Sequence, residues 1–271
     1  MPAPSIVRVT SVPPWVSLAD PDVRSYIRRV EAADEQALEP MVRRAIDAFV
    51  RGCKADGTWP AIKASCIMAG ARTLAGALTP LVGTAPTNFN FVAGDYDRKT
   101  GLVGNGSTKY LDSNRNSNAD PQNNFHFSCY ISTAGTQAGV GAYIGNGGPI
   151  GGSTGASLIA NNTTANDFFF RVRSLSGSVV TPSTLTGFAG GARSSSASYA
   201  TRVSSASLNI SITSQTTLAL NSFIFGRNDA GSANALSNAR LSFYSIGEAL
   251  DLALLDARVT ALINAIGAAL P

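Results

Sequence analysis

The sequence predicts a mainly β protein, an antiparallel β-sandwich or jelly roll with helices at both ends. Three observations predict it. From Pro86 onward, short β-branched or aromatic runs alternate with Gly, Ser and Asn clusters. On either side of this region, apolar residues recur at helical spacing. Charged residues make up only 14% of the 271 residues, so Ser, Thr, Asn and Gly must cover the surface, as is typical of β-proteins.

The chain divides into an extended arm, a helical segment, a sandwich and a closing helix. Pro13 and Pro14 cannot donate backbone hydrogen bonds, so the arm is extended. Its apolar side chains leave two interpretations open, a loose tail or an arm that docks on a neighbouring subunit. The predicted parts are 1–19 for the extended N-terminal arm, 20–85 for the helical segment, 86–248 for the β-sandwich domain and 249–271 for the C-terminal helix.

The helical segment begins at Asp20, which can cap a helix whose first residue is Pro21. A second helix stops near Gly57, and Asp251 can cap the closing helix, predicted at 251–268. We expect the N- and C-terminal helices to pack together. The apolar stripe of the second helix is Leu38, Met41, Val42, Ala45, Ile46 and Phe49. The stripe of the closing helix is Leu252, Leu255, Val259, Leu262, Ile263 and Ile266.

The remaining predicted elements follow from local patterns. A turn of helix is expected at 58–62, a small buried strand at 65–71 and a short helix at 72–78. Asn105–Gly106 is typical of a tight turn between two strands. Sandwich strands are predicted at 88–92, 102–103, 108–111, 125–133, 139–144, 157–161, 167–174, 187–193, 198–203, 207–212, 222–227 and 239–246.

Charge, cysteine usage and hydropathy exclude several classes of protein. The net charge is +4 without a basic run interleaved with aromatics, so we expect no nucleic-acid binding. Three cysteines without a CxxC pair indicate buried free thiols. The N-terminus lacks the features of a signal peptide, and the apolar stretch 61–82 contains Lys63 and Arg72. We therefore expect cytoplasmic synthesis and no membrane insertion.

The residue pattern does not favour catalysis. His126 is the only histidine, and no GxSxG motif surrounds a serine. His126 is expected to face solvent or to bond a neighbour, and to be dispensable for activity, as are the cysteines. Glycosidases need two carboxylates across a cleft, but the predicted β-region has one glutamate, Glu248. Asp- and Asn-rich loops leave calcium open, although Asx turns are the commoner use of such residues. We predict no enzyme, no cofactor and no metal site.

One segment is similar to a known family. Arg98, Gly101, Gly104, Asn105, Gly106, Ser107, Thr108, Tyr110 and Leu111 form an Arg-x-x-Gly-x-x-Gly-Asn-Gly-Ser-Thr turn ending in Tyr-Leu. With "DGTW" before it and the closing strand and helix after it, the chain resembles tailed-bacteriophage virion proteins with a concanavalin A-like (laminin-G-like) jelly roll. The resemblance covers about residues 35–271.

The resemblance implies a structural virion protein: a tail fibre or fibre-tip subunit, or a head decoration or spike. It implies other virion proteins as partners, a homo-oligomer such as a trimer, and a lectin-like domain open to host-surface glycans. A depolymerase acting on host polysaccharide is the alternative. A sugar site needs an aromatic platform with polar groups. The candidates are Tyr110, Asp112, Asn114, Arg115 and Asn116, which we expect in a loop; turn capping or a subunit contact is the competing interpretation.

Overall fold

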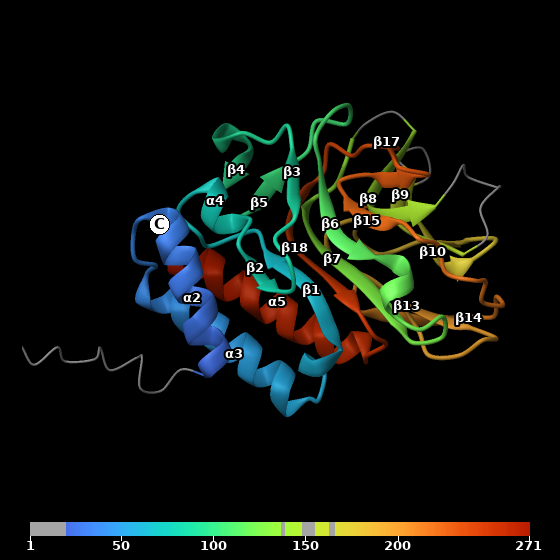
Figure 1. The fold of residues 1–271 in the computed structure, drawn as a ribbon, viewed down its shortest axis with the longest axis horizontal. Coiled ribbons are helices and arrows are strands. Elements are labelled where there is room, and N and C mark those ends of the chain that lie inside the picture. The colour runs from blue at the N-terminus through green and yellow to red at the C-terminus, as the bar shows by residue number, and fades with distance from the viewer. Residues whose placement is uncertain (1–19, 137–138, 148–154, 163–165) are drawn as a thin grey trace, which may run out of the picture.

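Two antiparallel sheets packed face to face form a β-sandwich, and helices cover the outer face of one sheet (Figure 1). This computed structural model describes residues 20–136, 139–147, 155–162 and 166–271. The predicted sandwich with a helical segment before it and a helix after it is confirmed. The predicted arm at 1–19 lies outside the described residues.

The sheet beneath the helices, sheet A, is built around β18 and β7. Its main path is β14-β13-β12-β7-β18-β1-β2, with β5 paired to β18 and β4 to β5. Tyr244 on β18 pairs with Cys129 on β7 and with Cys66 on β1. The strands are β1 (Ile62–Ile67), β2 (Pro80–Val82), β4 (Tyr96–Asp97), β5 (Gly101–Val103), β7 (Phe125–Thr133), β12 (Gly187–Arg193), β13 (Tyr199–Val203), β14 (Ala206–Ile210) and β18 (Arg240–Gly247).

The opposite sheet, sheet B, follows the order β11-β10-β9-β8-β15-β6-β3. A hairpin of β16 and β17 joins it, and β16 runs parallel to β8. The strands are β3 (Thr87–Phe89), β6 (Tyr110–Asn116), β8 (Val140–Gly147), β9 (Ala156–Asn162), β10 (Asp167–Ser174), β11 (Ser178–Val180), β15 (Asn221–Ile224), β16 (Arg227–Asp229) and β17 (Ser232–Asn234).

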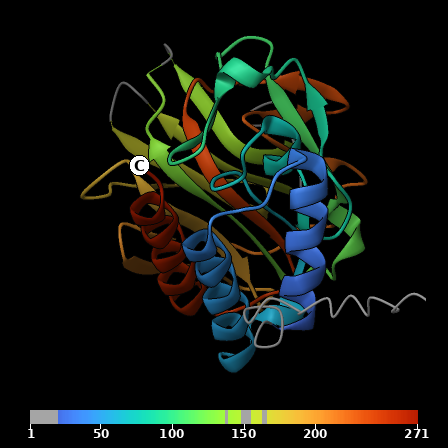
Figure 2. The same cartoon turned by 90° about the vertical axis from the view of Figure 1, so that its left-hand side faces the viewer.

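Three long helices, α2 (Pro21–Asp34), α3 (Pro40–Ala55) and α5 (Leu252–Ala269), lie side by side across sheet A, with α3 in the middle (Figure 2). The predicted caps are confirmed. Asp20 accepts a hydrogen bond from the N–H of Asp22, and Asp251 accepts from Ala253 and Leu254. The short elements are α4 (Leu74–Ala77), η1 (Trp59–Ala61), η2 (Ala93–Asp95) and η3 (Ser117–Ala119).

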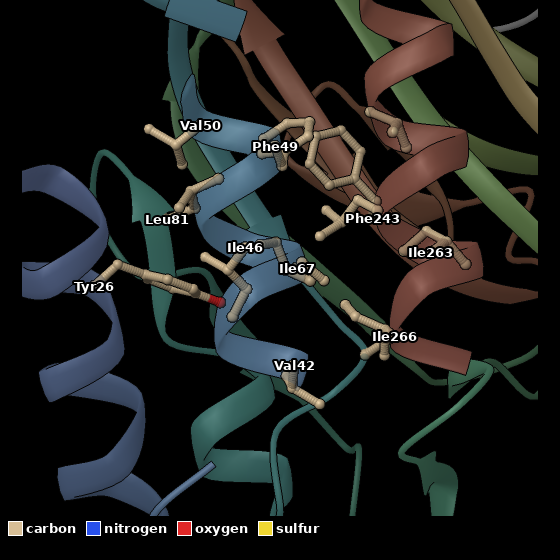
Figure 3. Packing of buried hydrophobic residues seen from close by; sticks show 14 of the residues in the cluster. Tyr26, Val42, Ile46, Phe49, Val50, Ile67, Leu81, Phe243, Ile263 and Ile266 are labelled. Carbon is tan, nitrogen blue, oxygen red and sulfur yellow. The ribbon is translucent and has the colours of Figure 1, made fainter. Parts of the chain in front are cut away.

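A first hydrophobic core joins the helices to sheet A, so the predicted packing of the two helical regions is confirmed. Phe49 of α3 points toward Phe243 of β18, and Ile46 of α3 lies beside Tyr26 of α2 (Figure 3). The rings of Phe49 and Phe243 meet edge to face at 5.8 Å. All six residues predicted to form the buried face of the closing helix are buried. A second core, between the sheets, holds the inward side chains of both.

Several local predictions are wrong. Met41 was placed in the buried stripe of α3, but its side chain is 54% exposed. The helical segment 20–85 also contributes β1 and β2 to sheet A; a strand was predicted for the first of these and none for the second. The predicted strand at 65–71 forms earlier, at Ile62–Ile67. The strands β2, β4, β11, β16 and β17 were not predicted, because strands of two or three residues are too short to show a clear period.

Helix α5 is long and apolar enough to cross a membrane by length and composition alone. A core helix of a soluble protein passes the same test, and the buried face of α5 contacts α3 and sheet A. Its Asp256 carboxylate pairs with Arg202 of β13 at 2.7 Å, which ties the helix to the sheet.

Candidate functional site

The turn that carries the family resemblance connects the sandwich to the helices. Arg98 donates from Nε to the carbonyl of Ala71 at 2.9 Å, and its Nη2 pairs with Glu39 at 2.7 Å. Glu39 is the N-cap residue of α3. Arg98 therefore joins the turn between β4 and β5 to the start of a helix, a structural role.

Two glycines of the turn are required by close backbone approach. A Cβ on Gly101 would lie 2.2 Å from the carbonyl oxygen of Leu241, and one on Gly104 would lie 2.0 Å from that of Ser237. Gly101 also has a left-handed φ of 95°. Because real Cβ atoms do not approach oxygen so closely, no other residue fits without moving a strand.

The side chain of Asn105 caps the turn that follows β5. Its Oδ1 accepts hydrogen bonds from the backbone N–H groups of Ser107, Thr108 and Lys109 at 2.9–3.0 Å. Gly106 supplies a φ of 70°. A tight turn at Asn105–Gly106 is therefore present, and its polar residues are used by the backbone. The strands that flank it, β5 and β6, lie in opposite sheets, so it does not close a hairpin as the prediction implied.

The candidate residues after the turn lie in a strand and not in the expected loop. β6 runs from Tyr110 to Asn116 and pairs with β3 and β15. Leu111 points into the core between the sheets. Since side chains alternate along a strand, Tyr110 and Asp112 face the outer side of sheet B. The Asp/Asn pattern had favoured a loop, but pairing with two neighbouring strands overrides that propensity.

Aromatic rings from three strands stack on this outer side. Phe89 of β3 lies parallel to Tyr110, with ring centroids 4.3 Å apart and an angle of 5° between the planes. Phe223 of β15 packs on Tyr110 at 4.7 Å. The Phe89 side chain is 36% exposed while Phe223 is buried. The three rings are here called the aromatic ladder. They form a continuous apolar surface that is exposed to solvent at Phe89.

Polar groups border the aromatic ladder. Asp112 accepts hydrogen bonds from the side-chain amide of Asn221 at 3.2 Å and from the N–H of Asn114 at 2.8 Å. The exposed Asn114 donates from Nδ2 to Ala85 at 2.8 Å and to Thr87 at 3.0 Å. Its φ of 54° is one that asparagine tolerates better than most residues. The arrangement offers carboxylate, amide and hydroxyl groups beside an aromatic surface.

Tyr110 keeps its proton in this setting. Burial, and then the negative charge of Asp112, raise the pKa of the Tyr110 phenol. The hydroxyl is therefore neutral at physiological pH and can both donate and accept a hydrogen bond.

Arg115 and Asn116 do not join this group. Arg115 was singled out because no partner is evident in its sequence neighbourhood, but its Nη2 pairs with the buried carboxylate of Asp120 at 2.5 Å. Asn116 caps η3 by accepting from the N–H of Asn118 at 3.2 Å. Of the five predicted residues, the structure brings together Tyr110, Asp112 and Asn114, and it gives the other two structural partners.

Phe89 and Phe223 were not among the residues predicted for the site. Both occur in alternating runs, "NFNF" and "SFIF", in which two aromatic residues two positions apart are typical of one face of a strand. That pattern could have singled them out as strand aromatics. Their stacking with Tyr110 depends on the pairing of β3 and β15 with β6.

His126 is buried beneath the start of α5 and does not face solvent. Its Nδ1 lies 2.5 Å from the carbonyl oxygen of Glu248, so this nitrogen carries the proton and donates. Its Nε2 lies 2.7 Å from the hydroxyl of Ser245. The expectation that it bonds a neighbour is confirmed, and it holds the connection between β18 and α5.

Burial lowers the pKa of His126 from 6.5 to about 4, against the smaller opposing effect of the Glu248 hydrogen bond. The unfolded chain therefore binds a proton near pH 6.5 while the folded protein does not, and stability falls as the pH drops. We expect His126 to remove about 2 kcal/mol of unfolding free energy between pH 7 and pH 5. Urea unfolding across this range measures the loss.

The control for this prediction is His126→Gln, which keeps polar groups but does not titrate. Ordinary carboxylates titrate mainly below pH 5, so the variant should lose little stability over the same range. Equal slopes in both proteins would contradict the assignment.

The cysteines are buried free thiols, as predicted. Burial raises the pKa of Cys53 to about 11 and that of Cys66 to about 12, and it also raises that of Cys129. Thiolate chemistry is therefore suppressed at all three positions. Within the described ranges, no group of three or more His, Cys, Asp or Glu side chains could hold a metal ion.

Comparisons with known proteins assign neither a family nor a function to the chain. No family model matches the chain, and no curated protein sequence matches it. Three of the similar solved structures are the K499G mutant of NanB sialidase from Streptococcus pneumoniae, the IT-sialidase CBM40 of Ruminococcus gnavus, and a Trypanosoma rangeli sialidase mutant displaying trans-sialidase activity.

The likeness to each is distant. The identities are 12%, 10% and 11%, and the TM-scores are 0.42, 0.40 and 0.47, in the same order. The matches cover 56%, 58% and 83% of this chain, and 26%, 96% and 39% of those chains. The chain thus spans about a quarter of the NanB sialidase chain that it matches. With TM-scores below 0.5, these likenesses carry no argument about activity.

Proposed function

We propose that this chain is a non-enzymatic structural protein of a tailed-bacteriophage virion, located in a tail fibre or a head decoration. In this proposal the helical side attaches the domain to other virion proteins, and the sandwich is displayed as a lectin-like domain that contacts host-surface glycans. The resemblance of the segment around Arg98–Leu111 supports the virion context. The aromatic ladder supports the glycan contact.

The observation that carries the glycan contact is the position of the aromatic ladder. It lies on the outer side of sheet B, whereas α2, α3 and α5 cover the outer side of sheet A. The surface that displays Phe89 and the surface that the helices cover thus belong to opposite sides of the sandwich. A domain attached through its helices would present Phe89 outward.

The chemistry of the ladder fits a sugar. The apolar C–H face of a pyranose packs on an aromatic ring, while its hydroxyls need donors and acceptors close by. Phe89 offers the ring, and Asp112, Asn114 and Thr87 offer polar groups on the adjoining positions of the same two strands. A stacked, half-buried neighbour, Tyr110, holds the Phe89 ring in place, so little conformational entropy is lost on binding.

The test is adsorption of the purified protein to host cells and to host surface polysaccharide. Phe89→Ala should weaken binding about tenfold, because one aromatic contact is worth roughly 1 kcal/mol or more. Asn114→Ala should weaken it less. Val179→Ala is the matched control, since Val179 is an exposed apolar residue at the far edge of the same sheet.

Unchanged binding by a folded Phe89→Ala variant would remove the glycan contact from the proposal. Release of reducing ends from the polysaccharide by the wild-type protein would favour a depolymerase instead. Loss of incorporation into particles, with adsorption of the purified protein retained, would indicate that the ladder is an assembly contact.

A further inference from the structure

A groove of mixed polarity lies where the chain enters its first helix. It has a volume of about 370 Å³ and is open to solvent. Trp59 of η1 and Val82 of the edge strand β2 supply partly exposed apolar surface, and the buried Ile62 and Leu81 form the floor. Ser25 and Arg29 of α2 form one wall. Leu81 lies between α2 and α3 in the close-up of the core (Figure 3), so the floor of the groove continues into the hydrophobic core.

The charged groups at the rim are already engaged. Asp22 pairs with Lys54 at 2.6 Å, and Lys63 pairs with Glu248 at 3.1 Å. Arg29 donates to the carbonyl of Pro80 at 2.8 Å. What the groove offers a ligand is the half-buried indole of Trp59 beside the exposed Pro60, bordered by these engaged polar groups. An aromatic ring bordered by hydrogen-bonding groups suits a proline-rich segment, whose rings pack on the indole.

The chain itself supplies such a segment next to the groove. Asp20 is fixed, because its N–H donates to Asp47 at 3.0 Å and its carboxylate accepts from Lys54 at 2.7 Å. Its ψ of 144° is that of extended chain. Asp22, two residues later, already lines the groove. The residues just before Asp20 therefore start at its edge.

We propose that residues 12–16, "VPPWV", dock in this groove of the same copy. They lie four to eight residues before Asp20, a reach of about 12–25 Å for polyproline-like chain at roughly 3.1 Å per residue. Two prolines restrict the free segment, so it loses little entropy on docking, and proline-rich segments bind aromatic-lined grooves. Trp15 and two valines supply the apolar surface that the groove leaves uncovered.

Docking in the same copy is favoured by the short connection. A tether of a few residues gives a local concentration on the order of millimolar, which a second copy reaches only at high protein concentration. The alternative interpretation of the arm is that it docks on a neighbouring subunit. The experiment below distinguishes the two arrangements.

Tryptophan fluorescence tests occupancy, because Trp15 and Trp59 are the only tryptophans in the chain. Trp59→Phe keeps an aromatic floor and leaves Trp15 as the sole indole. Its emission should be blue-shifted, as for an indole out of water, and should move to the red when Ser25→Arg fills the groove. Ala48→Arg, on the exposed face of α3, is the matched control and should leave the emission unchanged.

Trp15 emission like that of a free peptide, or unaffected by Ser25→Arg, would overturn the docking. Cross-linking then shows whether the segment docks in its own chain or in a second chain. The native thiols are buried, so mild oxidation of a Ser11→Cys, Ser25→Cys variant reports only the introduced pair. We expect a bridge within one chain, with its yield falling several-fold when Trp15→Ser is added. A bridge between two chains, or a yield that Trp15→Ser does not change, contradicts the proposal.

Discussion

Leu255→Asp should abolish the cooperative thermal transition of the protein or lower its unfolding free energy by more than about 4 kcal/mol. Leu255 is fully buried in the core that joins α5 to α3 and sheet A. An aspartate there loses the apolar contacts of leucine and places a carboxylate where water cannot reach it. Urea unfolding followed by circular dichroism measures the loss. Ile46→Asp, from the α3 side of the same core, should behave in the same way.

Leu254→Asp is the control for this experiment. The neighbouring residue occupies the same helix but is 39% exposed, so its replacement should cost less than about 1 kcal/mol. The test separates a docked helix from a loosely attached one. If Leu255→Asp kept the wild-type melting temperature, the packing of α5 on the rest of the protein would be wrong.

Gly104→Ala should be the second most damaging of the changes considered, at about 3 kcal/mol or more. The added methyl group would lie 2.0 Å from the carbonyl oxygen of Ser237 and 3.1 Å from the ring of Phe225. Neither backbone can move freely. The N–H of Gly104 donates to Ala239 at 2.9 Å, and that of Ser237 donates to Phe225 at 2.9 Å.

The matched control is Gly94→Ala, because a Cβ at Gly94 meets nothing within 4 Å. It should be neutral within about 0.5 kcal/mol, or slightly stabilising through the reduced entropy of the unfolded chain. Equal melting temperatures for the two variants would show that the close approach at Gly104 is not required. A strong effect at Gly104 alone would establish that the motif at Arg98–Leu111 is required for the fold.

Residues 96–133 form a stretch that is rich in Asp, Asn, Arg and Gly. Most of its polar groups are used by the fold: Arg98 joins the turn to α3, Asn105 caps the turn, and Asp120 pairs with Arg115. What remains for a ligand is the outward side of β6. The candidate site is therefore smaller than the sequence suggested, and it is more aromatic.

The sequence alone determined those elements whose signal is local. The caps at Asp20 and Asp251 follow from side chains that accept from nearby N–H groups, and the buried face of α5 follows from a regular apolar period. The strands Phe125–Thr133, Asp167–Ser174 and Gly187–Arg193 form over the residues predicted, because their runs are long and strongly patterned.

Only the tertiary structure decided which residues meet across the chain. The apolar period places Met41 in the stripe of α3, but a position at the border of a stripe is buried only if a neighbouring element covers it. Arg115 finds Asp120 because η3 turns the chain back toward β6. The aromatic ladder forms because β3 and β15 both pair with β6, which brings Phe89 and Phe223 beside Tyr110. Strand pairing between distant segments depends on the whole sandwich, and no short window of sequence contains it.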